Sequence, residues 1–466
     1  MTRIVRTGTT VEIRDAPPNV TYSIRERFTF AVAGAEYSKA FQEKRWDGRL
    51  RLFRWNREED TFTGPPGLFD EVVAMAVEKN WEHEVIEELP EEEPIDVGGW
   101  AGHPLRDYQE IAVEKALAQH HAILRMAIRS GKTLVAARMI HERSVRVLFV
   151  CPTTDLMHQT ADKFRAWLPD CNVGRFGEGV ADDHADVVVA TLGTILSRGA
   201  PACTDLYVDE VHHNSTADAW REELLSIPCV RRYGLSATID VSRKRSNETG
   251  AIWIRGLCGR IAFDVSASDL IEAGYLKRPT IHFVRYDGPK MPVAWNAKTI
   301  DLGIVRNRAR NDEIVRVVGE QVALGRRVLI DVERIAHGRI LTDALKTALG
   351  PRKVNWLCGT HPRSVRDLAL KMLSENLVSV LVSTLFSEGT DVPELEVVIV
   401  AGGGKSDIAT MQRLRNLTSF PGKGEVSVFD FSDETQQHLK RHTSARLAAY
   451  KREPSFRIVI DDRRAS

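Results

Sequence analysis

The chain has 466 residues, of which 43% are hydrophobic and 27% are charged, and its 64 Lys and Arg balance its 64 Asp and Glu. This length predicts two or three domains, and the zero net charge excludes a chain-wide polyanion-binding surface. The six cysteines are scattered without a C-x-x-C pair, which argues against a disulfide framework or a zinc site. The N-terminus lacks the apolar core of a signal peptide and no apolar run is long enough to span a membrane, so we expect a cytoplasmic protein without a membrane partner.

Residues 1–98 are expected to form a small α+β domain. The alternating stretches TTVEIRD and YSIRERFTFAV predict strands, and LFDEVVAMAVEKN predicts an amphipathic helix. The acidic stretch at residues 81–94, followed by GGWAGHP, predicts a linker to the next domain.

Residues 39–57 are strongly basic, with seven Lys or Arg against Glu43 and Asp47. Aromatic residues are interleaved among them, and Asp47-Gly48 predicts a turn. The segment is equally compatible with a basic hairpin that contacts phosphates and stacks on bases, and with a solvated face over buried aromatic residues. In the first interpretation, the nucleic-acid contacts are Lys44, Arg45, Trp46, Arg49 and Arg51.

Residues 121–133 predict a phosphate-binding loop. An apolar run leads into Ser130-Gly131-Lys132-Thr133, and the helical pattern LVAARMIHER follows at once. In such a strand–loop–helix, backbone N–H groups face the phosphates, Lys132 adds a positive charge and Thr133 can ligate Mg²⁺. The pattern G-x-x-x-x-G-K-[ST] is not fully met, because Met126 stands at its first glycine, so SGKT alone is also compatible with a chance helix start.

Upstream, RDYQ opens a predicted helix in which the Gln109 amide offers the paired donor and acceptor that suit an adenine edge. Downstream, alternating strand and helix patterns predict a parallel sheet, whose ligands lie at the carboxyl ends of the strands. Asp209 and Glu210 end one such strand. Asp209 would hold Mg²⁺ and Glu210 would orient or deprotonate an attacking water, whereas the alternative is a capping pair before a helix.

RDYQ, SGKT, DEVHH and GLSAT, in this order and spacing, resemble the motifs of superfamily 2 helicases of the DExH type. The resemblance implies two tandem RecA-like lobes, here residues 99–278 and 279–466, that use ATP and Mg²⁺. It implies ATP binding by Arg106, Gln109, Arg129, Ser130, Gly131, Lys132 and Thr133. It also implies that Thr133 and Asp209 bind Mg²⁺. Ser236 and Thr238 would couple the state of the bound nucleotide to the binding of the nucleic-acid strand.

Further motifs extend the resemblance. The loops CPT and ATLGT resemble strand-contacting motifs, which implies phosphate contacts for Thr153 and Thr191. In the second lobe, STLFSEGTDVP resembles motif V and implies that Gly389 and Asp391 face ATP and that Thr384 faces a strand phosphate. His212 and His213 have no further ligands at zinc spacing and are interpreted as contacts between the lobes.

Two motifs depart from the family pattern. Motif VI retains Gln412 and Arg413, but both arginine-finger positions are lost, to Asn416 and Ser419, so that Arg413 or Arg415 would have to stabilise the transferred phosphoryl group. In the phosphate loop, an arginine stands at position 129, where these helicases have a glycine that eases tight backbone curvature. Hydrolysis is still expected, because the catalytic residues Lys132, Asp209 and Glu210 are retained.

The basic stretch KRWDGRLRLF, at residues 44–53, and the tail at residues 438–458 resemble UvsW-type phage recombination helicases. This resemblance implies an ATP-dependent DNA helicase that migrates Holliday junctions, regresses forks and dissolves R-loops. It implies a monomer in the host cytoplasm that binds single-stranded, duplex and branched DNA without sequence preference, together with RNA–DNA hybrids. Two alternatives stay open: an RNA helicase or restriction-type translocase subunit, and a nucleotide-gated DNA-binding or annealing protein without turnover.

Overall fold

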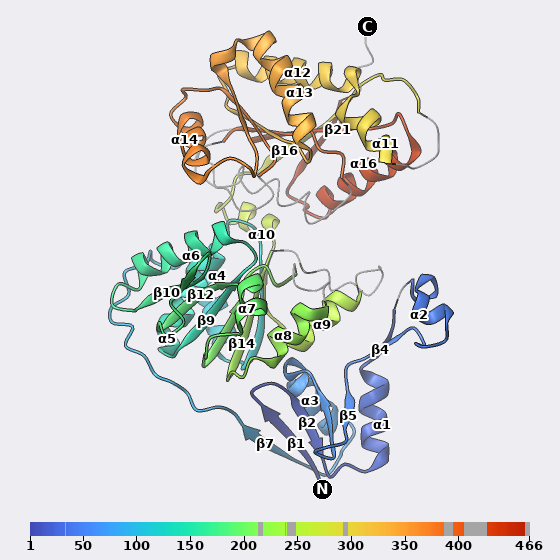
Figure 1. Cartoon of the computed structure of the whole chain (residues 1–466), viewed down its shortest axis with the longest axis vertical. Helices are drawn as coiled ribbons and strands as arrows, with labels where there is room; N and C mark the ends of the chain where they lie inside the picture. Colours follow the sequence, from blue (N-terminus) through green and yellow to red (C-terminus); the bar gives the residue numbers. More distant parts are fainter. Residues whose placement is uncertain are drawn as a thin grey trace. The chain divides into compact units, whose positions relative to one another are not determined.

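The computed structural model describes residues 1–32, 34–212, 218–237, 239, 248–291, 297–385, 395–404 and 426–461. The chain divides into two compact units, Met1–Val265 and Ser266–Ser466 (Figure 1). In the described ranges, no helix is both long enough and apolar enough to cross a membrane.

The first unit begins with a five-stranded sheet in the order β5-β6-β2-β1-β7. Its strands are β1 (Thr2–Thr7), β2 (Val11–Arg14), β5 (Arg54–Asn56), β6 (Thr61–Gly64) and β7 (His83–Glu88), and its helices are α1 (Pro18–Arg27) and α3 (Phe69–Glu78). Alternate residues of the strands and one face of each helix form a shared apolar core, which includes Ile4, Ile13, Ile24 and Phe62. The α+β prediction for this segment agrees with the structure.

Two predictions for this segment are wrong in detail. YSIRERFTFAV was expected to be one strand, but its first half lies in α1, because Pro18 starts a helix and Val20 and Ile24 face the core at helical spacing. The acidic stretch was expected to be a linker, but its first part is β7, which pairs in parallel with β1. Sequence alone does not show this pairing because β7 is an edge strand with mostly exposed side chains.

An arm, residues 29–51, extends from this sheet (Figure 1). It is a separate two-stranded sheet of β3 (Thr29–Ala31) and β4 (Arg49–Arg51), with the short helix α2 (Lys39–Gln42) between them. Gly48, with φ +75°, directly precedes β4 and does not join two paired strands. The basic hairpin expected around Asp47-Gly48 is therefore wrong in detail, because β4 pairs with β3, on the far side of α2, and not with the following strand, β5.

The N-terminal sheet is fixed to the rest of the first unit by buried polar contacts. The fully buried Arg232 guanidinium donates to the Gly8 carbonyl at 2.8 Å and to the Leu224 carbonyl at 2.6 Å. Leu224 lies near the C-terminal end of α8 (Asp218–Ser226), where the helix dipole favours a cation. The carboxylate of Glu71, on α3, also pairs with Arg255 and Arg260.

Gly67 lies in this contact, where no side chain fits. A Cβ atom there would stand 2.5 Å from the Arg255 carbonyl oxygen and 2.7 Å from that of Gly256. We expect Gly67→Ala to lower the free energy of unfolding by about 1–3 kcal/mol, because rigid backbone atoms would have to move. Urea denaturation checks this, with Gly99→Ala as the matched control, since a Cβ at Gly99 meets nothing within 4 Å. Equal midpoints for the two variants would contradict the tight contact.

The first unit continues with an eight-stranded sheet in the order β11-β10-β12-β9-β13-β14-β8-β15. Its strands are β8 (His121–Met126), β9 (Val147–Cys151), β10 (Val173–Gly177), β11 (Val180–Ala181), β12 (Val187–Thr191), β13 (Asp205–Val208), β14 (Arg231–Ser236) and β15 (Arg260–Val265). Helices that accompany it are α4 (Asp107–Leu117), α5 (Lys132–Arg143), α6 (Thr154–Trp167), α7 (Leu192–Arg198), α8 and α9 (Glu248–Cys258). All its pairings except β10–β11 are parallel, and its central strands are buried, as in sheets covered on both faces.

The second unit holds a seven-stranded parallel sheet in the order β18-β19-β17-β20-β21-β16-β22. Its strands are β16 (Pro279–Arg285), β17 (Val328–Asp331), β18 (Val354–Leu357), β19 (Val380–Ser383), β20 (Val397–Val400), β21 (Val426–Ser432) and β22 (Arg457–Asp461). Its helices include α10 (Ala267–Glu272), α11 (Ala297–Ile300), α12 (Arg308–Ala323), α13 (Ile335–Leu349), α14 (Arg363–Ser374) and α16 (Gln437–Tyr450). Two parallel-sheet α/β lobes after a small α+β domain are the predicted fold class, which is confirmed.

Candidate nucleotide-binding site

The predicted motifs of the first unit meet at one edge of its large sheet. β13, β14 and β8 are neighbours in the sheet, and at their carboxyl ends lie Asp209 and Glu210, Ser236, and the loop of residues 127–131, respectively. Parallel α/β sheets bind ligands at this edge. The topology therefore assembles one site from motifs that are far apart in the chain.

The loop at residues 127–131 has the shape that the sequence predicted. Gly131 precedes α5 with φ +84°, and a Cβ atom there would collide with the Gln109 amide. Arg129 also has a positive φ, +67°. A left-handed conformation costs an L-residue about 1–2 kcal/mol. Arg129 therefore strains the backbone of the loop, where a glycine would not.

Two side chains from the start of α4 fix the loop by hydrogen bonds to its backbone. The Gln109 amide donates to the Ser130 carbonyl at 2.7 Å, and the Tyr108 hydroxyl donates to the same oxygen at 2.8 Å. The Gln109 side-chain oxygen also accepts from the Arg106 backbone N–H, which caps the helix. Tyr108 was not among the predicted site residues, although it stands beside Gln109 in RDYQ. Adenine recognition by Gln109 stays a prediction.

The site contains groups suited to a nucleotide. The Ser130 hydroxyl is buried and has no hydrogen-bond partner within the described ranges. Lys132 Nζ lies 3.4 Å from a carboxylate oxygen of Glu210, and both side chains are largely buried. A cation at the N-terminus of α5, beside exposed backbone N–H groups, matches the chemistry of a triphosphate.

The residues also fit Mg²⁺ in the form that nucleotide sites use. Within the described ranges, no three His, Cys, Asp or Glu residues gather into a metal-binding group. Mg²⁺ is commonly held by one or two protein oxygens together with substrate phosphates and water. Thr133, at the start of α5, and Asp209, only 9% exposed at the end of β13, are suitable ligands of this kind.

His212 links Glu210 to Ser236. Its Nδ1 lies 2.8 Å from the Ser236 hydroxyl and 3.4 Å from the second carboxylate oxygen of Glu210. The ring is buried, at 8% exposure. The structure thus places the His212 ring inside the first unit, beside Ser236 at the end of β14. The contact between the lobes stays a prediction.

The two predicted strand-contacting threonines also lie at this edge of the sheet. Thr153 caps α6 and accepts from the Leu156 N–H at 3.3 Å, whereas the hydroxyl of Thr191 lies 2.9 Å from that of Thr194. Beside them, Cys151 ends β9, and burial, with the charge of Asp209, raises the pKa of its thiol well above its usual value. The thiol therefore stays protonated and unreactive.

The other predicted site residues lie elsewhere. Thr384 follows β19 in the second unit and is half-buried. In the arm, Lys44, Arg45 and Arg49 are exposed, whereas Trp46 and Arg51 are half-buried. The remaining predicted residues lie outside the described ranges, namely His213, Thr238, Gly389, Asp391, Gln412, Arg413 and Arg415 with the altered positions Asn416 and Ser419.

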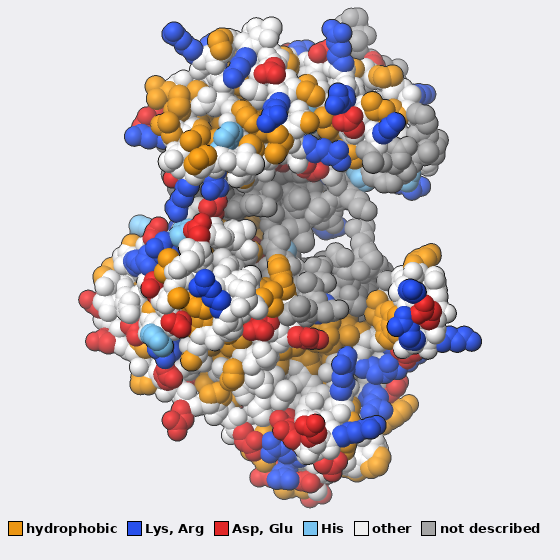
Figure 2. All heavy atoms as spheres, in the orientation of Figure 1, with side chains coloured by type: hydrophobic (Ala, Val, Ile, Leu, Met, Phe, Trp, Pro, Cys, Tyr) orange, Lys and Arg blue, Asp and Glu red, His pale blue; other side chains and the backbone are white. Residues whose placement is uncertain are grey.

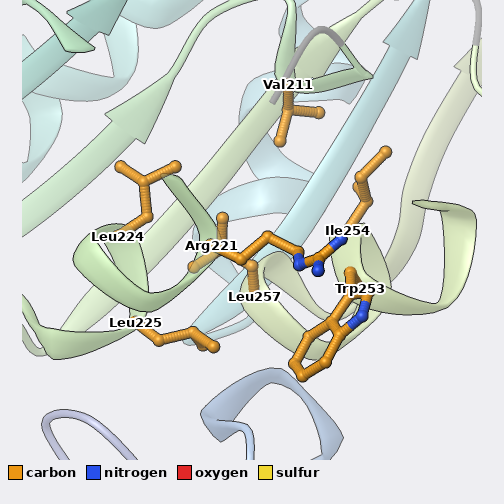
Figure 3. Close-up of a pocket in the computed structure, with 7 residues that line it drawn as sticks. All are labelled: Val211, Arg221, Leu224, Leu225, Trp253, Ile254 and Leu257. Carbon is orange, nitrogen blue, oxygen red and sulfur yellow. The ribbon is translucent and has the colours of Figure 1, made fainter. Parts of the chain in front are cut away.

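A separate pocket lies between α8 and α9 (Figure 3). The Arg221 guanidinium lies over the Trp253 ring, 5.0 Å from its centroid. The other lining residues are aliphatic: Val211, Leu224, Leu225, Ile254 and Leu257. An apolar lining of this kind does not suit a triphosphate, so the pocket is not part of the nucleotide site.

The chain is similar in sequence to known helicases and translocases. Residues 102–241 match the family model described as type III restriction enzyme, res subunit. The chain is 24% identical to the ATP-dependent DNA helicase UvsW of Enterobacteria phage T4, over 90% of this chain and 88% of the relative. It is 25% identical to the DNA 3'-5' translocase XPB2 of Sulfurisphaera tokodaii, over 66% and 77%.

Solved structures support the fold. Dbp5 of S. cerevisiae bound to RNA and ADP BeF3 matches with a TM-score of 0.55 and 15% identity, over 85% of this chain and 93% of that one. The type ISP restriction-modification enzyme LlaBIII bound to DNA matches with a TM-score of 0.56 and 14% identity, over 83% and 34%. The motifs, the fold and these relatives thus agree in one class of protein, because the chain is similar to superfamily 2 helicases. Within it, the chain resembles the UvsW-type phage helicases over nine-tenths of its length.

Proposed function

We propose that the protein is an ATP-dependent DNA helicase or translocase that acts on branched DNA, including Holliday junctions, stalled forks and R-loops. The observation that carries the proposal is the assembly of Lys132, Glu210, His212 and Ser236 at one sheet edge. One relative is named an ATP-dependent DNA helicase and another a DNA 3'-5' translocase, which supports DNA as the substrate and ATP as the energy source. We further propose that it acts as a monomer in the cytoplasm and accepts RNA–DNA hybrids.

The residues divide the reaction among them. Lys132 and the N–H groups at the start of α5 bind the phosphates, and Glu210 orients and deprotonates the attacking water. Thr133 and Asp209 would hold Mg²⁺, which would supply positive charge beside the phosphates. His212 lies between Glu210 and Ser236, the last residue of β14. Through this contact, a change in the bound phosphates can reach β14. Thr238 would take part in this coupling, Gly389 and Asp391 would face ATP, and Arg413 or Arg415 would stabilise the transferred phosphoryl group.

The test measures ATP hydrolysis with no nucleic acid, single-stranded DNA, a four-way junction or RNA. We expect the junction to stimulate turnover most, and Lys132→Ala to abolish turnover and junction migration together, because the phosphates lose their main cation. Stimulation by RNA alone would replace the proposal with an RNA helicase. Junction processing unchanged in Lys132→Ala would overturn the motor and leave a nucleotide-gated binding or annealing protein.

Arg129 offers a prediction with two opposed effects. Arg129→Gly is expected to raise the free energy of unfolding by up to about 1 kcal/mol, because it relieves the positive φ of +67°. It is also expected to raise KM for ATP about tenfold, as expected when a charge-assisted hydrogen bond of about 1.5 kcal/mol is lost. Thermal unfolding and steady-state kinetics check the two effects. An unchanged KM would show that the guanidinium does not reach the phosphates.

A further inference from the structure

The tip of the arm presents aromatic rings to solvent. Tyr37 is 82% exposed and Phe41 is 38% exposed. The inner side of Phe41 packs on the turn, since a Cβ atom at Gly48 would lie 3.1 Å from its ring and 3.0 Å from Ala35. The Trp46 indole is engaged within the arm, where it donates to the Arg49 carbonyl at 2.9 Å. Tyr37 and Phe41 are therefore the rings that the arm offers to a ligand.

Cations accompany these rings. Some of the arm's charge is neutralised internally, because Arg45 and Lys39 pair with Glu43 and Arg51 pairs with Asp47. Among the described residues, neither Lys44 nor Arg49 has a carboxylate within ion-pair distance. Figure 2 shows Lys and Arg side chains gathered on the arm and on the neighbouring part of the N-terminal domain.

Backbone hydrogen bonds fix the position of Lys44 in the arm. Lys44 has a φ of +56°, its N–H donates to the Phe41 carbonyl at 2.9 Å, and the Arg45 N–H donates to the Ala40 carbonyl at 2.8 Å. These bonds close the chain after α2 and fix Lys44 beside Phe41. Exposed rings on an ordered, projecting support favour a ligand that stacks.

We propose that the arm tip is a base-stacking contact of the branched-DNA substrate. Tyr37, with Phe41 beside it, stacks on an unpaired base at the end of a duplex, while Lys44 and Arg49 hold the adjacent phosphates. This inference rests on the proposed function and assigns a DNA contact to Tyr37 and Phe41.

The chemistry favours a nucleic acid over a protein partner. Each base has a π-face, and base–aromatic stacking combined with cations on the backbone gives grip without sequence preference. A stable protein interface buries roughly 800 Å² on each partner, far more than two rings on a narrow arm provide. Two exposed rings and two cations therefore suit a contact with a base and its neighbouring phosphates.

The experiment uses the full chain and a forked DNA with 2-aminopurine at the first unpaired position. Tyr37→Ala is expected to weaken fork binding about five- to a hundredfold, the range for loss of one base–aromatic stack, and to abolish the fluorescence change on binding. Tyr37→Phe keeps the ring and should retain both. Tyr22→Ala is the matched control, because Tyr22 is 65% exposed on α1 in the same domain. Thermal unfolding verifies that each variant is folded.

The outcomes separate this inference from the proposed function. If the wild type binds the fork and hydrolyses ATP in response to it, but Tyr37→Ala binds equally well, only the stacking contact is overturned. Equal losses in Tyr37→Phe and Tyr37→Ala, or in Tyr22→Ala, would also overturn it, because the ring would then not be the cause. Both proposals would be overturned if the wild type did not bind the fork and its ATP hydrolysis did not respond to DNA.

Discussion

Glu210→Gln is expected to lower the rate of ATP hydrolysis at least about a hundredfold, the effect of losing a general base. Glutamine keeps the size of the side chain and can still hydrogen-bond, but it cannot accept a proton from water. In the wild type, the Glu210 carboxylate lies between Lys132 Nζ and His212 Nδ1, each 3.4 Å away. ATP binding should persist, because the change leaves Lys132 free to meet the phosphates.

Single-turnover kinetics and equilibrium binding of a fluorescent ATP analogue measure the two quantities separately. Glu142→Gln is the matched control, because Glu142 pairs with Arg138 on the surface of α5 in the same unit. Turnover in Glu210→Gln close to that of the wild type would show that another group activates the water. Loss of ATP binding would instead show that Glu210 is needed to hold Lys132 in place.

Arg446→Met is expected to lower the free energy of unfolding of the second unit by about 3–5 kcal/mol, the usual cost of breaking a buried ion pair. Arg446 and Asp430 are fully buried, with hydrogen bonds of 2.9 and 3.1 Å from the Arg446 Nε to the two carboxylate oxygens. Asp433 lies 3.4 Å away. Burial opposes the charge, but Asp430 and Asp433 together raise the pKa of the Arg446 guanidinium above its usual value.

Urea unfolding followed by circular dichroism tests this expectation. Arg441→Met, at an exposed position of the same helix, is the control and should change the midpoint little. Adding Asp430→Asn to Arg446→Met should recover part of the loss, because it removes the carboxylate that loses its cation, whereas Asp433 keeps its ion pair with Arg310. A stability loss in Arg446→Met no greater than that in the control would show that the buried network contributes little.

Much of the fold was predictable because its signals are local. Strand–loop–helix patterns around SGKT, and an apolar strand ending in Asp209 and Glu210, indicate a parallel α/β sheet with ligands at its carboxyl edge. The first half of YSIRERFTFAV was mispredicted because the apolar residues in so short a stretch fit the repeat of a helix and the repeat of a strand equally well. The two prolines that precede it favour the start of a helix. The two interpretations of the aromatic residues in the basic segment each hold for part of them, because Phe53 is buried in the core and Trp55 is exposed.

The sequence by itself determined the order of the motifs, the residue types at the candidate nucleotide site and the resemblance to superfamily 2 helicases, because these depend on neighbours along the chain. Only the tertiary structure showed that Gln109 and Tyr108 hold the Ser130 carbonyl and that His212 joins Glu210 to Ser236. These contacts depend on which strands lie side by side, and β8, β13 and β14 are adjacent in the sheet although their order in the chain is different. Pairing of distant strands is decided by packing of the whole core, which no short stretch of sequence encodes.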